Sequence, residues 1–190
     1  LPHLNKGELG DRHVERVVRR GLFGYPDNPT PIAKEKAECV PPTRYGFRSF
    51  DRQWIIPDNR LLNRPNPELW QSHSERQLYL TAPSDRSPTT GPALSFTTCI
   101  PDLHHYNGRG GRVFPFWRDA AGKTANLPPK LLEFLSSKYK KPIAAEDFIA
   151  YLAAIAANPA YTTRFRDDLA QPGLRMPITA QAKLFDEAVD

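Results

Sequence analysis

The chain has 190 residues, of which 39% are hydrophobic and 25% are charged, a balance that excludes intrinsic disorder and allows one folded domain, or one domain with an arm. It contains no run of 18 apolar residues and no signal peptide, so we predict a cytoplasmic protein without a membrane partner. The net charge of +5 is unevenly placed: residues 1–141 carry 22 Lys and Arg against 14 Asp and Glu, whereas residues 142–190 carry 4 against 7. A basic body with an acidic end suits a polyanion on one face, most often nucleic acid, although charge alone does not decide this.

Two cysteines, Cys39 and Cys99, have neither metal-site spacing nor the number needed for a disulfide framework. We expect free thiols in a reducing compartment, with a single bridge as the alternative. Twenty prolines, about twice ordinary usage, predict short elements and many loops. The sequence begins at Leu1 without a methionine or a targeting pattern, so we expect a segment of a larger protein.

The first 43 residues are predicted to form an N-terminal helix followed by a proline-rich arm or linker. Asp11 is a plausible N-cap, and three valines then recur at helical spacing among four arginines. This basic helix could lie on phosphate or pack against a neighbouring domain, and the sequence does not separate the two. Five prolines in residues 25–43 indicate an extended arm. Residues 44–190 are predicted to be the folded domain.

Residues 45–58 concentrate four aromatic side chains and two arginines. Their alternation predicts two short strands around a bend at Asp51 and Arg52, closed by a turn after Ile56. We expect the aromatic side chains in the core and the arginines on the opposite side, with Tyr45, Phe50 and Trp54 assigned to the core. The alternative is a hairpin whose arginines are merely solvated.

The middle of the chain predicts a short helix and three strands, at residues 67–73, 77–81, 93–100 and 113–117. Between the last two strands, residues 102–112 contain three glycines and two arginines, which suit close contact with phosphate or guanine but also a flexible turn. Adjacent His104 and His105 point to opposite sides of an extended segment, and no further Cys or His cluster follows, so no metal site is expected.

The last third of the chain predicts helices at residues 128–139, 146–157, 160–169 and 179–189. Phe148, Leu152 and Ile155 form an apolar stripe on the second of these and are assigned to the core. Asn158-Pro159-Ala160-Tyr161 is similar to a catalytic motif of amino-group DNA methyltransferases, but it follows a helical pattern, so we interpret it as a helix junction. No catalytic motif is present. Two interpretations remain: a nucleic-acid-binding module, or a basic structural module that binds proteins.

Three segments resemble the C-terminal specificity domain of type ISP restriction-modification enzymes. Tyr-Gly-Phe-Arg-Ser-Phe-Asp-Arg-Gln-Trp-Ile from residue 45 is similar to its Tyr-Arg-Pro-Phe-Asp-Asn-Arg-Trp-Ile signature, residues 148–166 to its helix pair, and Leu-Arg-Met-Pro-Ile from residue 174 to its Pro-Arg-Ile-Pro-Leu segment. The sequence departs from the family pattern at Gly46, Ser49 and Asn158. The resemblance covers residues 44–180 and implies a domain that reads a short DNA sequence.

The resemblance further implies an upstream methyltransferase domain, adenine-N6-specific and dependent on S-adenosylmethionine, in a parent chain that can also carry nuclease and helicase activities. It implies no cofactor and no catalytic centre in this fragment. We therefore predict an α+β fold, with a mainly antiparallel curved sheet and a helical C-terminal third, that binds double-stranded DNA and presents the target to the methyltransferase. The predicted DNA-contacting residues are Arg48, Arg52, Arg60, Arg64, His105, Asn107, Arg109 and Arg112.

Overall fold

A computed structural model describes residues 22, 29–38, 40–62, 65–84, 91–106, 110–171 and 173–190. The helix predicted after Asp11 and the thiol of Cys39 lie outside these residues, whereas Cys99 is a free thiol. The elements are, in chain order, η1 (Ile32–Lys34), β1 (Thr43–Arg48), β2 (Asp51–Ile55), α2 (Pro67–Gln71), β3 (Tyr79–Pro83), β4 (Ser95–Thr97), β5 (Ile100–Pro101), β6 (Gly111–Pro115), α3 (Leu131–Tyr139), α4 (Ala145–Ala157), α5 (Pro159–Arg164), α6 (Arg166–Leu169) and α7 (Ala182–Val189).

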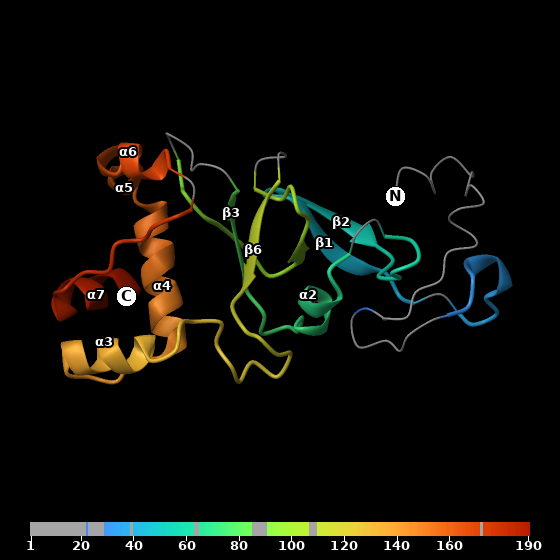
Figure 1. The fold of residues 1–190 in the computed structure, drawn as a ribbon, viewed down its shortest axis with the longest axis horizontal. Helices are drawn as coiled ribbons and strands as arrows, with labels where there is room; N and C mark the ends of the chain where they lie inside the picture. Colours follow the sequence, from blue (N-terminus) through green and yellow to red (C-terminus); the bar gives the residue numbers. More distant parts are fainter. Residues whose placement is uncertain are drawn as a thin grey trace.

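The predicted α+β class is confirmed, and the described strands form two three-stranded sheets rather than one. The first sheet has the order β2-β1-β5 and the second the order β4-β3-β6. All pairs are antiparallel except β1 with β5, which run parallel. Figure 1 shows the helical third on one side of the second sheet and the β1–β2 hairpin on the other.

Strand β3 connects the helical third to the β1–β2 hairpin, because its side chains point alternately toward one and the other. Leu80 and Ala82 pack in a cluster that includes Ala145 and Ala156 of α4. Tyr79 instead packs with Trp70 of α2 and the other residues behind the hairpin. The strand predicted at residues 93–100 is interrupted, and its two ends form the separate strands β4 and β5.

The helical third follows the predicted pattern, except that the helix predicted at residues 160–169 is divided at Phe165 into α5 and α6. Phe148 is buried and clusters with Leu135, Tyr151 and Phe185, while Leu152 and Ile155 pack against this cluster, so the predicted apolar stripe is confirmed. The junction after α4 is also confirmed. Asn158 ends that helix and caps α5, because its side-chain Oδ1 accepts a hydrogen bond from the amide of Ala160 at 2.9 Å.

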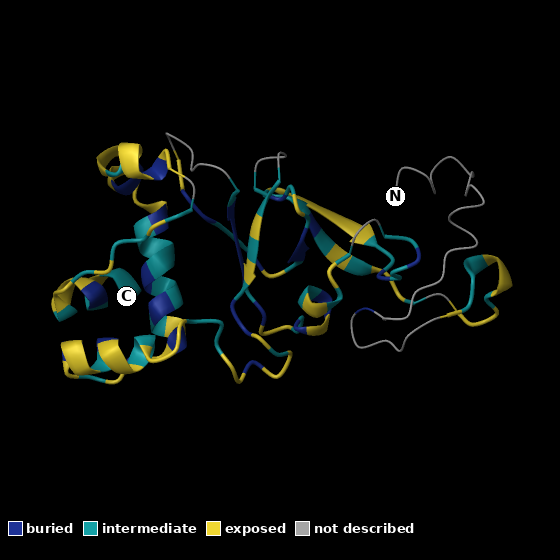
Figure 2. Cartoon of the chain, viewed as in Figure 1, coloured by how far each residue is buried: buried dark blue, intermediate teal, exposed yellow. Residues whose placement is uncertain are grey.

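The β1–β2 hairpin is present, but its turn and its core side differ from the prediction. Arg48 pairs with Asp51, so the turn is Ser49 and Phe50, and Asp51 and Arg52 belong to β2. The predicted burial of Phe50 and Trp54 is wrong, because these side chains are 103% and 60% exposed. Figure 2 shows β2 exposed along most of its length.

The described parts of the predicted N-terminal arm pack against the domain. Leu22 is fully buried in the cluster that contains Trp70 and Ile100. The backbone carbonyl of Thr30 and the carboxylate of Glu35 accept hydrogen bonds from Arg60. The division between residues 1–43 and 44–190 stays a prediction.

Candidate nucleic-acid interface

The outer face of the β1–β2 hairpin presents cationic and aromatic side chains to solvent. In the antiparallel register Arg44 lies opposite Trp54, and Gly46 lies opposite Arg52. Opposed residues of an antiparallel pair project to the same face, so these positions share one surface. Arg44, Arg52 and Trp54 are exposed, and the Arg44 guanidinium carbon lies 4.2 Å from the centre of the Trp54 ring. This cation–π contact orients Arg44 while its charge remains accessible.

The turn of the hairpin is tied to residues 102–106. The Ser49 hydroxyl lies 3.0 Å and 3.1 Å from the carbonyl oxygens of His105 and Tyr106, which accept its hydrogen bond. Arg48 donates to the Phe47 carbonyl and, at 3.2 Å, to the carboxylate of Asp102. Its guanidinium also covers the Phe47 ring at 3.9 Å. Arg48 is therefore partly exposed but already oriented by contacts within the protein.

Asp102 is the common acceptor of three hydrogen bonds. Its carboxylate accepts hydrogen bonds from the Tyr45 hydroxyl at 3.0 Å, from Arg48 and from the backbone amide of His104. Burial, together with this neighbouring carboxylate, raises the pKa of Tyr45 far above its usual value of 10.0, so the phenol stays protonated and remains a donor. The network fixes the hairpin to the loop before β6.

His105 was predicted to contact DNA, but the structure corrects this placement, because the side chain is 2% exposed. Its Nδ1 lies 3.2 Å from the Thr81 hydroxyl in β3, and its ring lies against Gly46 of β1. A Cβ at Gly46 would come within 3.0 Å of the imidazole, so the missing side chain makes room for the ring. Burial lowers the pKa of His105, which keeps the ring neutral between the two sheets.

Arg60 was also predicted to contact DNA, and the structure again places it inside the protein, 5% exposed. Its guanidinium donates to both carboxylate oxygens of Asp58, to Glu35 at 3.0 Å and to the Thr30 carbonyl at 2.7 Å. The hydrogen bond that Arg60 donates to Asp58 is the largest of the effects that raise the pKa of Arg60. As folded, Arg60 joins the arm to the turn after β2 and has no surface with which to contact a partner.

The remaining predicted contacts divide into two groups. Arg52 on β2 and Arg112 on β6 are exposed, and Arg48 is partly exposed, with 36% of its side chain accessible. Arg64, Asn107 and Arg109 lie outside the described residues, so their predicted contacts stay predictions. Arg44, Phe50 and Trp54 were not among the predicted contacts. The signal that could have selected Arg44 was its place one residue before Tyr45, since neighbours in a strand face opposite sides.

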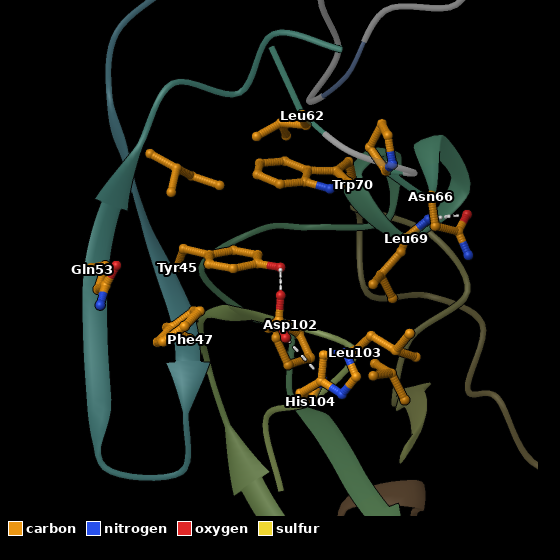
Figure 3. A pocket seen from close by; sticks show the side chains of 14 residues that line it. Tyr45, Phe47, Gln53, Leu62, Asn66, Leu69, Trp70, Asp102, Leu103 and His104 are labelled. Atoms are coloured by element: carbon orange, nitrogen blue, oxygen red, sulfur yellow. Dashed lines mark hydrogen bonds between the residues drawn. The ribbon is translucent and has the colours of Figure 1, made fainter. Parts of the chain in front are cut away.

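The inner face of the hairpin closes a separate cavity of 630 Å³ against α2 and the segment before His105 (Figure 3). Tyr45 stacks on Trp70 there, with ring centres 6.3 Å apart and planes inclined by 10°. Polar residues placed among its apolar walls include Gln53, Asn66, Asp102 and His104, and Asp102 accepts a hydrogen bond from Tyr45. The cavity thus lies on the face of the hairpin opposite to the exposed arginines.

Neither a metal centre nor a membrane span is found in the part of the chain that the structure describes. Within it, no three His, Cys, Asp or Glu side chains are grouped as metal ligands would be. No described helix is both long and apolar enough to cross a bilayer.

Comparison with known proteins identifies the family. The family model described as "Type ISP C-terminal specificity domain" matches residues 22–190. No match was found among curated proteins. A cryo-EM structure of a DrdV–DNA complex is similar to this chain with a TM-score of 0.63 and 19% identity, over 82% of this chain and 15% of that one.

A second similar structure is a nuclease-deletion mutant of the Type ISP restriction-modification enzyme LlaGI in complex with a DNA substrate mimic. It has a TM-score of 0.53 and 19% identity, over 83% of this chain and 14% of that one. At such identity the likeness shows the fold, and this chain spans only a small part of either protein. The match of the family model over most of the sequence goes further: the chain belongs to the family of Type ISP C-terminal specificity domains.

Proposed function

We propose that this domain binds double-stranded DNA and reads part of a short target sequence for a Type ISP restriction-modification enzyme. The observation that carries the proposal is the outer face of the hairpin, where Arg44 and Arg52 are exposed beside Trp54. Its family and the two similar proteins, whose structures contain DNA or a DNA mimic, support the choice of partner. Arginines on a fixed strand pair suit phosphate contacts along a duplex.

Sequence reading would fall to side chains that reach base edges. Arginine bonds guanine in a bidentate manner, and asparagine does the same with adenine. We assign these roles to Asn107, Arg109 and Arg112, which lie in or just after the glycine-rich segment, and we keep Arg64 as a further contact. Arg48 and Arg52 would hold phosphates near the turn. Arg60 and His105 are left out because both are buried in internal contacts.

The wider role is a proposal of the same kind. The domain would hold the target for a methyltransferase domain upstream in the same chain, which would bind S-adenosylmethionine and modify adenine at N6. Nuclease and helicase activities would likewise belong to other parts of the parent enzyme. The small share of DrdV and LlaGI that this chain covers leaves room for such domains in a parent of similar size.

A second candidate is a basic module that contacts protein and does not bind DNA alone. Exposed apolar side chains on the C-terminal third, Ile178 and Leu184, favour a protein contact at that end of the molecule. The first candidate requires that the chain binds DNA and the second that it does not bind DNA alone, which makes them separable by experiment.

The test is selection of the chain against a randomised duplex pool, with binding measured at about 50 mM and about 200 mM salt. We expect an enriched motif and an affinity that falls with salt. Replacing Arg44 or Arg52 with alanine should reduce the slope of log K against log salt by about 1 each, because each removes one phosphate contact. Salt-sensitive binding without enrichment would place specificity with the missing domains. No binding at low salt would favour the protein-contacting module.

A further inference from the structure

Within the part of the chain that the structure describes, Phe50 has no packing role that explains its position. It is 103% exposed, the most exposed large hydrophobic side chain in the described part of the chain. It lies in the second position of the turn between β1 and β2, where small or polar residues are usual. An aromatic side chain surrounded by water contributes no burial energy to folding. Its position therefore points to a partner.

The turn that carries Phe50 is held rigidly. Ser49 bonds to two backbone carbonyls of the loop behind it, and Arg48 bonds to Asp102. Ser49 and Arg48, the two residues before Phe50, are thus both bonded to another segment of the fold. Because the turn is already ordered, the Phe50 ring loses little conformational entropy on binding, which favours its insertion into a partner.

The charge around Phe50 identifies the chemistry of the partner. Arg52 follows two residues later on the exposed strand, and Arg44 lies farther along the same face with its guanidinium over Trp54. An apolar ring beside several exposed arginines complements a nucleic acid, which offers apolar base faces inside a rim of phosphates. It does not complement an apolar protein surface, which would leave the arginines without counter-charges.

We propose that Phe50 is a wedge that enters the stack between adjacent base pairs of the bound duplex, while Arg52 and Arg44 hold the flanking phosphates. The inference rests on the proposed DNA binding and adds a specific contact to it. Apolar side chains inserted between base pairs unstack them and kink the duplex by about 20–90°. Pyrimidine–purine steps open most easily, so the wedge would favour a TA or CA step without any hydrogen bond to a base.

The experiment compares the wild-type chain with Phe50→Ala, Phe50→Trp and Phe134→Ala on the duplex that binds best in the pool selection. Phe134 is a matched control, because it is also an exposed phenylalanine, 64% accessible, but it lies on α3 in the helical third. Three quantities are measured: the dissociation constant, the bend from energy transfer between dyes at the duplex ends, and the fluorescence of 2-aminopurine placed at successive steps. Thermal unfolding checks that each variant is folded.

For the wild-type chain we expect a bent duplex and enhanced 2-aminopurine fluorescence at one step. Phe50→Ala should weaken binding by about tenfold, in the range of losing one base–aromatic stack, and should abolish both signals. Phe50→Trp should retain them, Phe134→Ala should match the wild type, and all variants should unfold as the wild type does.

The possible failures are distinguishable. Absence of salt-dependent DNA binding by the wild type would overturn the proposed function and this inference together. Normal binding, bending and fluorescence in Phe50→Ala would overturn the wedge alone. Weaker binding by Phe50→Ala without any unstacked step in the wild-type complex would also overturn it, and would make Phe50 a groove or backbone contact.

Discussion

Replacement of Arg60 is the most direct test of whether this arginine serves the fold or DNA. Its side chain is 6% accessible, and its two carboxylate partners, Asp58 and Glu35, are 13% and 23% accessible. Removing one member of a buried ion pair costs about 3–5 kcal/mol, because the other charge is left without compensation. Both carboxylates keep some access to water, so we expect Arg60→Ala to lose about 3 kcal/mol, the lower end of this range.

The assay is urea unfolding followed by tryptophan fluorescence, which is suitable because Trp70 and Trp117 are buried. Arg60→Lys keeps the charge but cannot reproduce the forked contact with Asp58, so its loss should be smaller, about 1–2 kcal/mol. Arg52→Ala is the control. Because Arg52 is exposed, its replacement should change the free energy of unfolding by no more than about 0.5 kcal/mol.

DNA binding by the same variants decides the question. Folded Arg60→Lys should bind DNA with the salt slope of the wild type, whereas Arg52→Ala should show a lower slope. An Arg60→Ala variant that is as stable as the wild type and binds DNA with a reduced salt slope would show that Arg60 does not serve the fold. That result would restore Arg60 to the contacts expected from residue type alone.

Other parts of the fold give further predictions. Gly111→Ala should destabilise by about 1–3 kcal/mol in urea, because its Cβ would come within 2.7 Å of a backbone carbonyl on β3. Gly46→Ala meets the His105 side chain at 3.0 Å and a backbone oxygen only at 3.6 Å, so it should cost less; an equal or larger loss would contradict this. Burial lowers the pKa of His73 and His105 from 6.5 in the folded chain, so on acidification the unfolded chain binds protons at a higher pH than the folded chain does. The free energy of unfolding should therefore be at its full value above pH 6.5 and fall as the pH is lowered toward 5. Urea midpoints that do not change between pH 7.5 and 5.5 would exclude this linkage. Phe148→Ala should lose about 3–5 kcal/mol of unfolding free energy, and a loss below about 1 kcal/mol would show that the core repacks around it.

The helical third could be predicted because its signals are local. A period of 3.6 in the apolar residues, acidic residues in the first turn and Asn-Pro at the end define α4 without reference to the rest of the chain. The alternation that predicts the two strands of the hairpin is equally local, although it placed the turn between them two residues too late.

The side of each hairpin residue could not be predicted in the same way, because it depends on an irregularity within β1. Side chains alternate with a period of two, so one extra residue in a strand reverses the face of the residues paired beyond it, whereas a turn displaced by two residues does not. The structure closes the turn at Ser49 and Phe50, with an irregularity between Gly46 and Arg48. Trp54 then lies beside Arg44 on the outer face instead of in the core.

The burial of Arg60 and His105 could not be predicted for a different reason. Arg60 and His105 have residue types that are common at binding surfaces, and their neighbours in sequence do not indicate otherwise. Arg60 is buried by partners 25 and 30 residues away, and His105 bonds a threonine 24 residues away. Contacts of this range are set by the packing of the arm and the two sheets, which residue type does not report.

The hairpin combines residues fixed by internal contacts with residues that face solvent. Ser49, Asp102 and His105 make internal contacts, and substitution there must disturb the fold. Arg52 and Phe50 are exposed, so their replacement leaves the packed core unchanged. Substitutions at the outward positions can therefore change what the hairpin contacts without loss of stability, whereas substitutions at the internal positions cannot.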